Sequence, residues 1–148
     1  MQASSHCAAL IKKFDGLATG AYFQNGYWKI GYGHKCNDQD LKITPHNAEE
    51  MLVADLATLS LKLDGELFRS SIVVTQNQFD ALLSLVYEEG LELVKKSPLW
   101  RALQHGNMKI AASYFMNWNY EVLYDGVRVR RQYLVNRRKA EQQLFLEN

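Results

Sequence analysis

The sequence predicts a mostly helical α+β fold. Two capping signals, Thr44-Pro45 and Thr75, each precede apolar residues that repeat at helical spacing. Nearer the N-terminus, Asn25-Gly26 offers two positions that tolerate positive φ, which is the strongest short signal for a hairpin turn. Residues 28–32 then alternate large apolar side chains with Lys and Gly, as a strand with one covered face does. One local hairpin among several helices gives this fold class.

The elements follow in order from their caps and stops. Ser4 or Ser5 caps the first predicted helix, and Asp15-Gly16 ends it. Residues 37–42 are polar and predict a loop. The remaining boundaries predicted from the residues are a helix from Thr44-Pro45 to a stop at Asp64-Gly65, a helix from Thr75 to Gly90, a short helix from Ser97-Pro98, a break at Gly106-Asn107 and a turn at Asp125-Gly126.

Length and charge limit the function classes. A chain of 148 residues suits one domain with a sizeable core, and its net charge of +1 creates no global field for an anionic polymer. Basic residues nevertheless crowd the C-terminal part. These residues are Arg128, Arg130, Arg131, Arg137, Arg138 and Lys139. They could bind an anionic partner such as peptidoglycan or nucleic acid, but we favour a solvated helix face that pairs with Glu141 and Glu147.

Cysteine usage and hydropathy predict a simple soluble protein. Two cysteines, Cys7 and Cys36, are too few for a disulfide scaffold, and we expect free thiols. The histidines and cysteines show no metal-ligand spacing, so we expect neither a metal nor another cofactor. We also expect a monomer with no signal peptide and no membrane span. Such a chain is cytoplasmic when made and reaches a cell wall only by release or dedicated export.

Residues 14–34, FDGLATGAYFQNGYWKIGYGH, are similar to a known signature. They resemble the active-site stretch of the phage-type lysozymes (glycoside hydrolase family 24), which reads roughly FEG, AY, an Asp, a Gly turn, a Thr and IGYGH. The matching residues are Phe14, Gly16, Ala21, Tyr22, Gly26, Ile30, Gly31, Tyr32, Gly33 and His34. Three positions differ: Asp15, Gln24 and Lys29 stand where the family has its catalytic Glu, Asp and Thr. The frame is retained while the chemical groups have changed.

The resemblance covers nearly the whole chain. QNQFDALLSLVYEEG looks like the central helix of the family, with Glu88 where an Asn is common. Residues 110–118 look like the following helix, and residues 134–145 look like the closing helix. The resemblance implies a single lysozyme-like domain over residues 1–148. In this arrangement a cleft separates a hairpin lobe of about residues 15–43 from a helical lobe, which combines about residues 44–148 with the N-terminal helix. The segment 120–133 resembles nothing firmly.

The resemblance implies a glycosidase, and that chemistry needs a proton donor and a second group, usually both carboxyls. Asp15 could donate, but its carboxyl would sit on the order of 1.5 Å further back than that of Glu. Gln24 cannot ionise, although its amide can hydrogen-bond a sugar. A cation at Lys29 would favour the ionised form of Asp15 and oppose proton donation. For Lys29 itself, we slightly favour an exposed strand residue with its ammonium in solvent.

Other groups could take over part of the chemistry. Glu88 is the best substitute carboxylate, and Asp38 and Asp40 are weaker candidates. His34 is expected to make a structural hydrogen bond, although the resemblance also puts it at the substrate. Tyr22, Tyr32 and Trp28 would stack on a sugar ring or fill the core of the small lobe.

Three functional hypotheses remain open at this point. The first is a degenerate muramidase that keeps a saccharide-binding cleft for peptidoglycan or uses its surface for another partner. The second is an active peptidoglycan glycosidase in which Asp15 is the acid and Glu88 or a loop Asp provides the other half. The third is an effector whose basic C-terminal helix binds an anionic partner.

Overall fold

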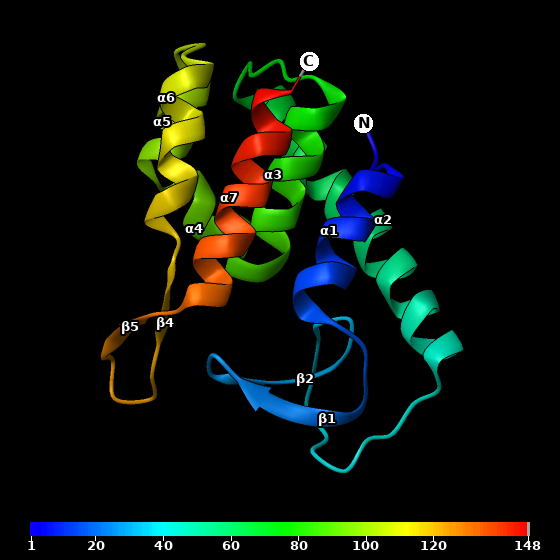
Figure 1. Ribbon diagram of the computed structural model, residues 1–148. Helices are drawn as coiled ribbons and strands as arrows, with labels where there is room; N and C mark the ends of the chain where they lie inside the picture. Colours follow the sequence, from blue (N-terminus) through cyan, green and yellow to red (C-terminus); the bar gives the residue numbers. More distant parts are fainter. Residues whose placement is uncertain (148) are drawn as a thin grey trace.

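The computed structural model describes residues 1–147 and confirms a mostly helical fold with small antiparallel sheets (Figure 1). The elements, in order, are α1 (Ser5–Asp15), β1 (Ala18–Gln24), β2 (Tyr27–Gly31), β3 (His34–Cys36), α2 (Pro45–Arg69), α3 (Gln76–Glu89), α4 (Leu91–Lys95), α5 (Pro98–Gln104), α6 (Met108–Tyr114), a 3₁₀ turn (Phe115–Asn117), β4 (Tyr120–Val122), β5 (Arg128–Arg130) and α7 (Gln132–Leu146).

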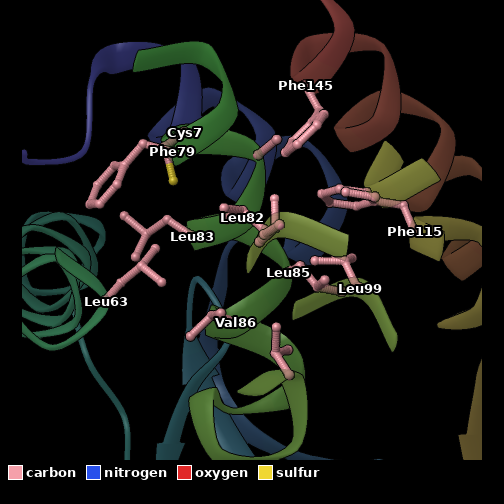
Figure 2. Close-up of a cluster of buried hydrophobic side chains, with 14 of the residues drawn as sticks. Cys7, Leu63, Phe79, Leu82, Leu83, Leu85, Val86, Leu99, Phe115 and Phe145 are labelled. Atoms are coloured by element: carbon pink, nitrogen blue, oxygen red, sulfur yellow. The ribbon is translucent and has the colours of Figure 1, made fainter. Parts of the chain in front are cut away.

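Helix α3 is the centre of the molecule. Its residues 79–86 are all buried, so it contributes side chains to the core on every side. Figure 1 shows α7 beside it, α1 and α2 on one flank and α4 to α6 on the other. Figure 2 shows how Leu82 and Leu85 of α3 meet Leu99 and Phe115, while Phe79 and Leu83 lie near Leu63 of α2. Burial of this helix positions whatever its C-terminal end carries.

The N-terminal region follows the predicted pattern. Ser4 caps α1 and Gly16 ends it at a φ of 66°. Asn25 and Gly26 both have positive φ, 51° and 83°, and join β1 to β2 as predicted. A third strand, β3, pairs with β2 and was not predicted, because three residues are too short for a periodic signal. The resulting sheet lies at one end of the helices, below α1 in Figure 1.

Helix α2 begins at Pro45 with a capping box between Thr44 and Asn47, but its predicted end was wrong. It continues through Asp64 and Gly65 to Arg69. The buried row continues too, because Leu67 packs into the core one turn after Leu63. A glycine inside a helix costs about 1 kcal/mol, which the burial of a further leucine outweighs.

The C-terminal half contains both confirmed and unforeseen elements. The cap Thr75, the end at Gly90, the short helix from Pro98 and the break before α6 are all as predicted. Helix α4 was not predicted, and neither was the β4–β5 hairpin that surrounds the predicted turn at residues 125–126. Both cysteines are free thiols, as expected, with Cys7 in the core. Over residues 1–147, no helix combines the length and the apolar composition that crossing a membrane requires.

Candidate active site

Asp15, the candidate proton donor, is the last residue of α1 and points into the protein. Its side chain is only 6% exposed, and Nη1 of Arg137 donates a hydrogen bond of 2.9 Å to its Oδ2. Its carboxyl lies against Gly33, where an added Cβ would come within 2.8 Å of the Asp15 Cγ. The glycine in the retained GYGH run therefore leaves room for this carboxylate.

Arg137 and Arg138 of α7 form the centre of a buried charge cluster, which we define as Asp15, Glu88, Glu141, Arg137 and Arg138. Arg137 contacts Asp15, Glu88 at 3.6 Å and Glu141 at 3.3 Å. Arg138 contacts Glu88 at 2.5 Å. Its Nε lies 2.8 Å from Oε1 of Glu141 without the alignment of a hydrogen bond, so that contact is an ion pair.

This cluster corrects the prediction of a solvated basic face on the C-terminal helix. The predicted pairing with Glu141 is confirmed. However, the side chains of Arg137 and Arg138 are buried, whereas Glu147 is exposed to solvent. α7 packs directly on α3, so its inward positions face the carboxylates at the end of α3 and α1. Arg137 and Arg138 are therefore not accessible to an anionic partner at the surface.

Glu88, the candidate substitute, lies beside Asp15 because both carboxylates contact Arg137. Burial acts to raise the pKa of Glu88, but Arg137, Arg138 and Lys29 outweigh it and hold the pKa below its ordinary value. Glu88 is therefore a carboxylate at any pH near neutral. It cannot serve as a proton donor, and the arginines occupy both of its oxygens.

Gln24 and Lys29 lie on the first two strands. Gln24 pairs with Tyr27 at the turn end of the hairpin and is half-buried. Lys29 pairs with Tyr22 across the strands and is only 4% exposed. The expectation that its ammonium lies in solvent was wrong. The position faces inward, and its charge acts on Glu88.

The candidate sugar-binding residues divide into two groups. Tyr22 is half-buried near the charge cluster, and burial together with Asp15 and Glu88 raises its pKa to about 12. Tyr32 packs against the core, and its carbonyl accepts a hydrogen bond from the Tyr87 hydroxyl. His34 makes the predicted structural contact, because its Nδ1 lies 2.6 Å from Oδ2 of Asp55.

The weaker candidates lie outside this group. Asp38 and Asp40 are exposed in the loop after β3, where Oδ1 of Asp38 accepts from the Asp40 amide in a local turn. Trp28 is half-buried and meets Phe23 edge to face at a centroid distance of 5.6 Å. Asp38 and Asp40 thus belong to one local turn in an exposed loop.

Two hollows border the end of α3. One has a volume of about 290 Å³ and is lined by Gly33, His34, Lys35, Asp55, Thr58, Leu59 and Tyr87. The other has a volume of about 280 Å³ and is lined by Asn25, Glu89, Leu93, Trp118, Tyr120, Val122 and Arg128. Tyr87 lines the first hollow and Glu89 lines the second. The two hollows therefore border the residues immediately before and after Glu88 on α3.

Glu89, at the edge of the second hollow, is a candidate site residue that was not predicted from the sequence. Its side chain is 14% exposed, and Oε1 lies 3.5 Å from Nη1 of Arg138. Burial, followed by the charge of neighbouring Glu88, raises the pKa of Glu89 to about 7. The signal in the sequence that could have indicated Glu89 is the pair of adjacent glutamates before Gly90, which ends the helix. The positions of Arg137, Arg138 and Lys29 give the two carboxyls different pKa values.

The β4–β5 hairpin touches the β1–β2 turn beside the second hollow. The backbone N–H of Asn25 donates to Oε1 of Glu121 at 3.2 Å, and the backbone N–H of Val122 donates to the side-chain Oδ1 of Asn25 at 3.4 Å. Arg131 holds the other oxygen of Glu121 at 2.9 Å. The segment 120–133, whose place the sequence left open, thus reaches the hairpin that carries Gln24 and Lys29.

Residues 12–141 match a protein-family model described as phage lysozyme. The chain belongs to the phage lysozyme family. It is 40% identical over 150 aligned residues to an endolysin of Bacillus phage PZA, and it spans 55% of that protein's length. It is 35% identical to an endolysin of Acyrthosiphon pisum secondary endosymbiont phage 1, with 98% of both chains covered.

Solved structures agree with this family assignment. The muramidase domain of SpmX from Asticaccaulis excentricus superposes with a TM-score of 0.84 at 31% identity, over 98% of this chain and 97% of that one. The endolysin from Escherichia coli O157:H7 phage FAHEc1 gives a TM-score of 0.79 at 30% identity, over 99% and 94%. The predicted lysozyme-like fold is therefore confirmed.

In this phage lysozyme homologue, the chemistry available at the centre is limited. Asp15 and Glu88 are both paired with arginines, Gln24 carries no charge, and Lys29 adds a cation. Such a centre can bind polar groups through Tyr22 and the Gln24 amide. Glu89, at the second hollow, has a pKa raised to about 7, so its carboxyl retains its proton to a higher pH than an ordinary Glu does.

Proposed function

We propose that this phage lysozyme homologue binds the glycan strands of peptidoglycan and cleaves them slowly or not at all. The observation that carries the proposal is the pairing of Asp15 and Glu88 with Arg137 and Arg138. A glycosidase acid must hold a proton, and its partner must be free to act as nucleophile or base. Here the guanidinium groups satisfy both carboxylates, which opposes both roles.

Binding is supported by what surrounds this centre. The hollows on either side of Glu88 offer aromatic rings, hydroxyls and amide groups, which are the groups that suit a sugar ring and its acetamido substituents. Tyr22 of β1 lies near Asp15 and Glu88 of the charge cluster, and its hydroxyl is protonated at neutral pH. Substrate contact at Tyr22, Tyr32 and His34 remains part of this proposal.

Binding is tested by sedimenting the chain with insoluble purified peptidoglycan. We expect the wild type to sediment with the wall and Tyr22→Ala to lose at least half of the bound fraction. The matched control is Tyr124→Ala, because Tyr124 is 99% exposed at the tip of the β4–β5 turn. No sedimentation of the wild type would refute glycan binding and leave a surface that serves a different partner.

Weak cleavage is tested by restoring the family groups. Asp15→Glu, Gln24→Asp and Lys29→Thr together return an acid, a second carboxyl and a small hydroxyl to the retained frame. We expect the triple variant to release muropeptides faster than the wild type, because Gln24→Asp returns a second carboxyl on β1, outside the charge cluster. If the triple variant binds the wall but stays inert, the arginine cluster itself must be incompatible with catalysis.

An active glycosidase is the second candidate, and Glu89 is the observation that favours it. A carboxyl with a pKa of about 7 at the edge of a hollow has the protonation state of a general acid. In that case turnover would fall as the pH rises through about 7, and Glu89→Gln would abolish it. Turnover that is unaffected by Glu89→Gln would exclude this role.

A further inference from the structure

The outer side of α2 carries a row of exposed apolar side chains that is separate from the candidate active site. The row contains Val53, Ala54, Ala57, Leu61 and Phe68, which fall on one face of the helix. Leu61 is 73% exposed and Phe68 is 85% exposed. The row is about 22 Å long at roughly 1.5 Å per residue. Asp64 lies on the same face between Leu61 and Phe68, with its side chain 53% exposed and paired with the N-terminal ammonium, so one charge interrupts the row. Large apolar side chains that are exposed on one helix face mark an interaction surface.

We propose that this α2 outer face is a self-association surface, on which a second copy of the chain packs its own α2 antiparallel. The proposal does not depend on the proposed function, and it replaces the monomer expected from the sequence. In Figure 1, α2 forms one edge of the helical array, so its outer face can meet another molecule. A two-fold contact of this kind uses the same face on both copies and closes at two chains.

Side-chain size favours the antiparallel arrangement. The N-terminal half of the row is small, with Val53, Ala54 and Ala57, whereas the C-terminal half carries Leu61 and Phe68. An antiparallel copy sets each Phe68 against the small half of the other helix, and the two Leu61 side chains meet near the axis. Large groups facing small ones give well-packed helix contacts. A parallel copy would oppose the two Phe68 rings and leave the small halves apart.

A hollow beside Phe68 adds to this fit. It has a volume of about 390 Å³ and is bordered by Gly65, Arg69 and Val73. Gly65 lacks a side chain, and Val73 is itself highly exposed. The N-terminal end of the second α2 would lie at this hollow and cover the apolar groups around it.

Charge supports the same orientation. Glu50 lies at the N-terminal end of the row, and Arg69 lies at the C-terminal end, with side chains 64% and 65% exposed. An antiparallel pair brings each Glu50 towards the Arg69 of the other copy. Glu50 now contacts exposed His46, and Arg69 contacts Glu66, which Lys95 also holds, so Glu66 stays paired if Arg69 turns to the other copy. The net charge of +1 adds almost no repulsion between copies.

The contact is one helix wide, so it is smaller than a standard interface of about 800 Å² per partner. We therefore expect a reversible dimer. The average mass, measured by sedimentation equilibrium of the full chain, should rise from one chain towards two with concentration. It should level off at two, because the surface is used up. A mass of one chain at every concentration, or growth beyond two chains, would overturn the proposal.

Variants connect the dimer to α2. Leu61→Glu with Phe68→Glu should keep the mass at one chain throughout, and both positions are exposed enough to leave folding intact. Tyr124→Glu with Val127→Glu is the matched control, because it also adds two negative charges at exposed residues, here outside α2, and should dimerise like the wild type. If the double variant dimerises as well as the control does, the surface lies elsewhere.

Orientation is tested by oxidative cross-linking in a Cys36→Ser background, where the remaining Cys7 is buried. Leu61→Cys should form a cross-linked dimer with itself. Phe68→Cys should not do so alone, but it should cross-link when mixed with Val53→Cys. Self-cross-linking of Phe68→Cys without reaction between the mixed variants would indicate a parallel pair and contradict the proposed arrangement.

Discussion

Glu88 and Glu89 are neighbours at the end of α3, yet they lie in opposite environments. Glu88 is surrounded by Arg137, Arg138 and Lys29, which lower its pKa despite burial. Glu89 faces the hollow beside the β4–β5 hairpin, and burial next to Glu88 raises its pKa to about 7. One helix therefore presents, at adjacent positions, a carboxylate with a lowered pKa and a carboxyl with a pKa of about 7. The arrangement of cations from α7 produces the difference, since the residue type is the same.

The contrast between Glu88 and Glu89 indicates which carboxyl of this chain could still donate a proton. The positions that resemble the family's catalytic set lie on the arginine side, where each carboxylate is already paired. The group with the protonation state of an acid lies on the other side, at a position that the family resemblance did not single out. Binding and catalysis can thus be examined on separate residues.

The largest expected effect is the loss of stability when Arg137 is removed from the charge cluster. Arg137→Ala would leave Asp15, Glu88 and Glu141 buried without their shared cation. Removing one partner of a buried ion pair costs about 3–5 kcal/mol, so we expect a loss of that size in the free energy of unfolding, measured with urea. Lys139→Ala, an exposed change on the same helix, should cost less than about 0.5 kcal/mol. Equal losses in the two variants would contradict a central role for Arg137.

Next is a difference in the pH dependence of stability. The folded protein holds the Glu89 proton up to about pH 7, whereas an unfolded Glu loses it near 4.5. The folded state then binds more protons in this window, so stability falls as the pH rises, by about 2–3 kcal/mol for a shift of this size. Glu141, whose pKa burial also raises, contributes in the same direction.

Glu88 contributes with the opposite sign. Its pKa is lowered in the fold, so its stabilisation is present above the unfolded value and is lost as the pH falls through the folded value. Urea midpoints at pH values between 4.5 and 7 should show a smaller fall in stability for Glu89→Gln than for the wild type. Exposed Glu92→Gln should retain the full wild-type slope. An unchanged slope in Glu89→Gln would show that the Glu89 carboxyl ionises normally.

A smaller loss of stability is expected from filling the space between Gly33 and the Asp15 carboxyl. Gly33 and Gly26 both have φ near 80°, but only Gly33 has a neighbour, the Asp15 carboxyl, within reach of a Cβ. Alanine at either position should cost about 1–2 kcal/mol for the left-handed backbone. Gly33→Ala should cost about 1 kcal/mol more for the crowding of Asp15. Calorimetric unfolding of both variants measures the difference, and equal costs would mean that Asp15 moves aside freely.

The smallest effect concerns the contact between hairpins. Glu121→Ala removes the acceptor for the Asn25 amide and the partner of Arg131. We expect about 1 kcal/mol of lost stability, together with faster hydrogen exchange of the Asn25 amide than in the wild type. Glu147→Ala, at the other end of α7, serves as the control. Unaltered exchange in Glu121→Ala would indicate that the two hairpins do not hold each other.

Much of the fold could be predicted because its signals are local. Caps such as Thr44 and Thr75, the Asn25-Gly26 turn and helical spacing each act within a few residues. The exceptions have physical reasons. Helix α2 passes the expected stop at Gly65 because burial of Leu67 favours its continuation. β3 and the β4–β5 strands are three residues long and exist through pairing, which no periodicity reveals.

The site was less predictable, because its character depends on contacts over long distances in the chain. Asp15 meets Arg137 across 122 positions, and Glu88 meets Arg138 across 50. Nothing local in the run of arginines distinguishes buried from solvated side chains. The same limit applies to Lys29, whose inward direction depends on how the sheet packs, and to Glu89.

The most direct test of wall binding without efficient cleavage is release of soluble muropeptides from purified peptidoglycan, with wild type and Asp15→Asn side by side. We predict little or no release from either protein, while both still sediment with the wall. Substantial release by the wild type that disappears in Asp15→Asn would contradict this, because it would make Asp15 a working acid despite its pairing with Arg137.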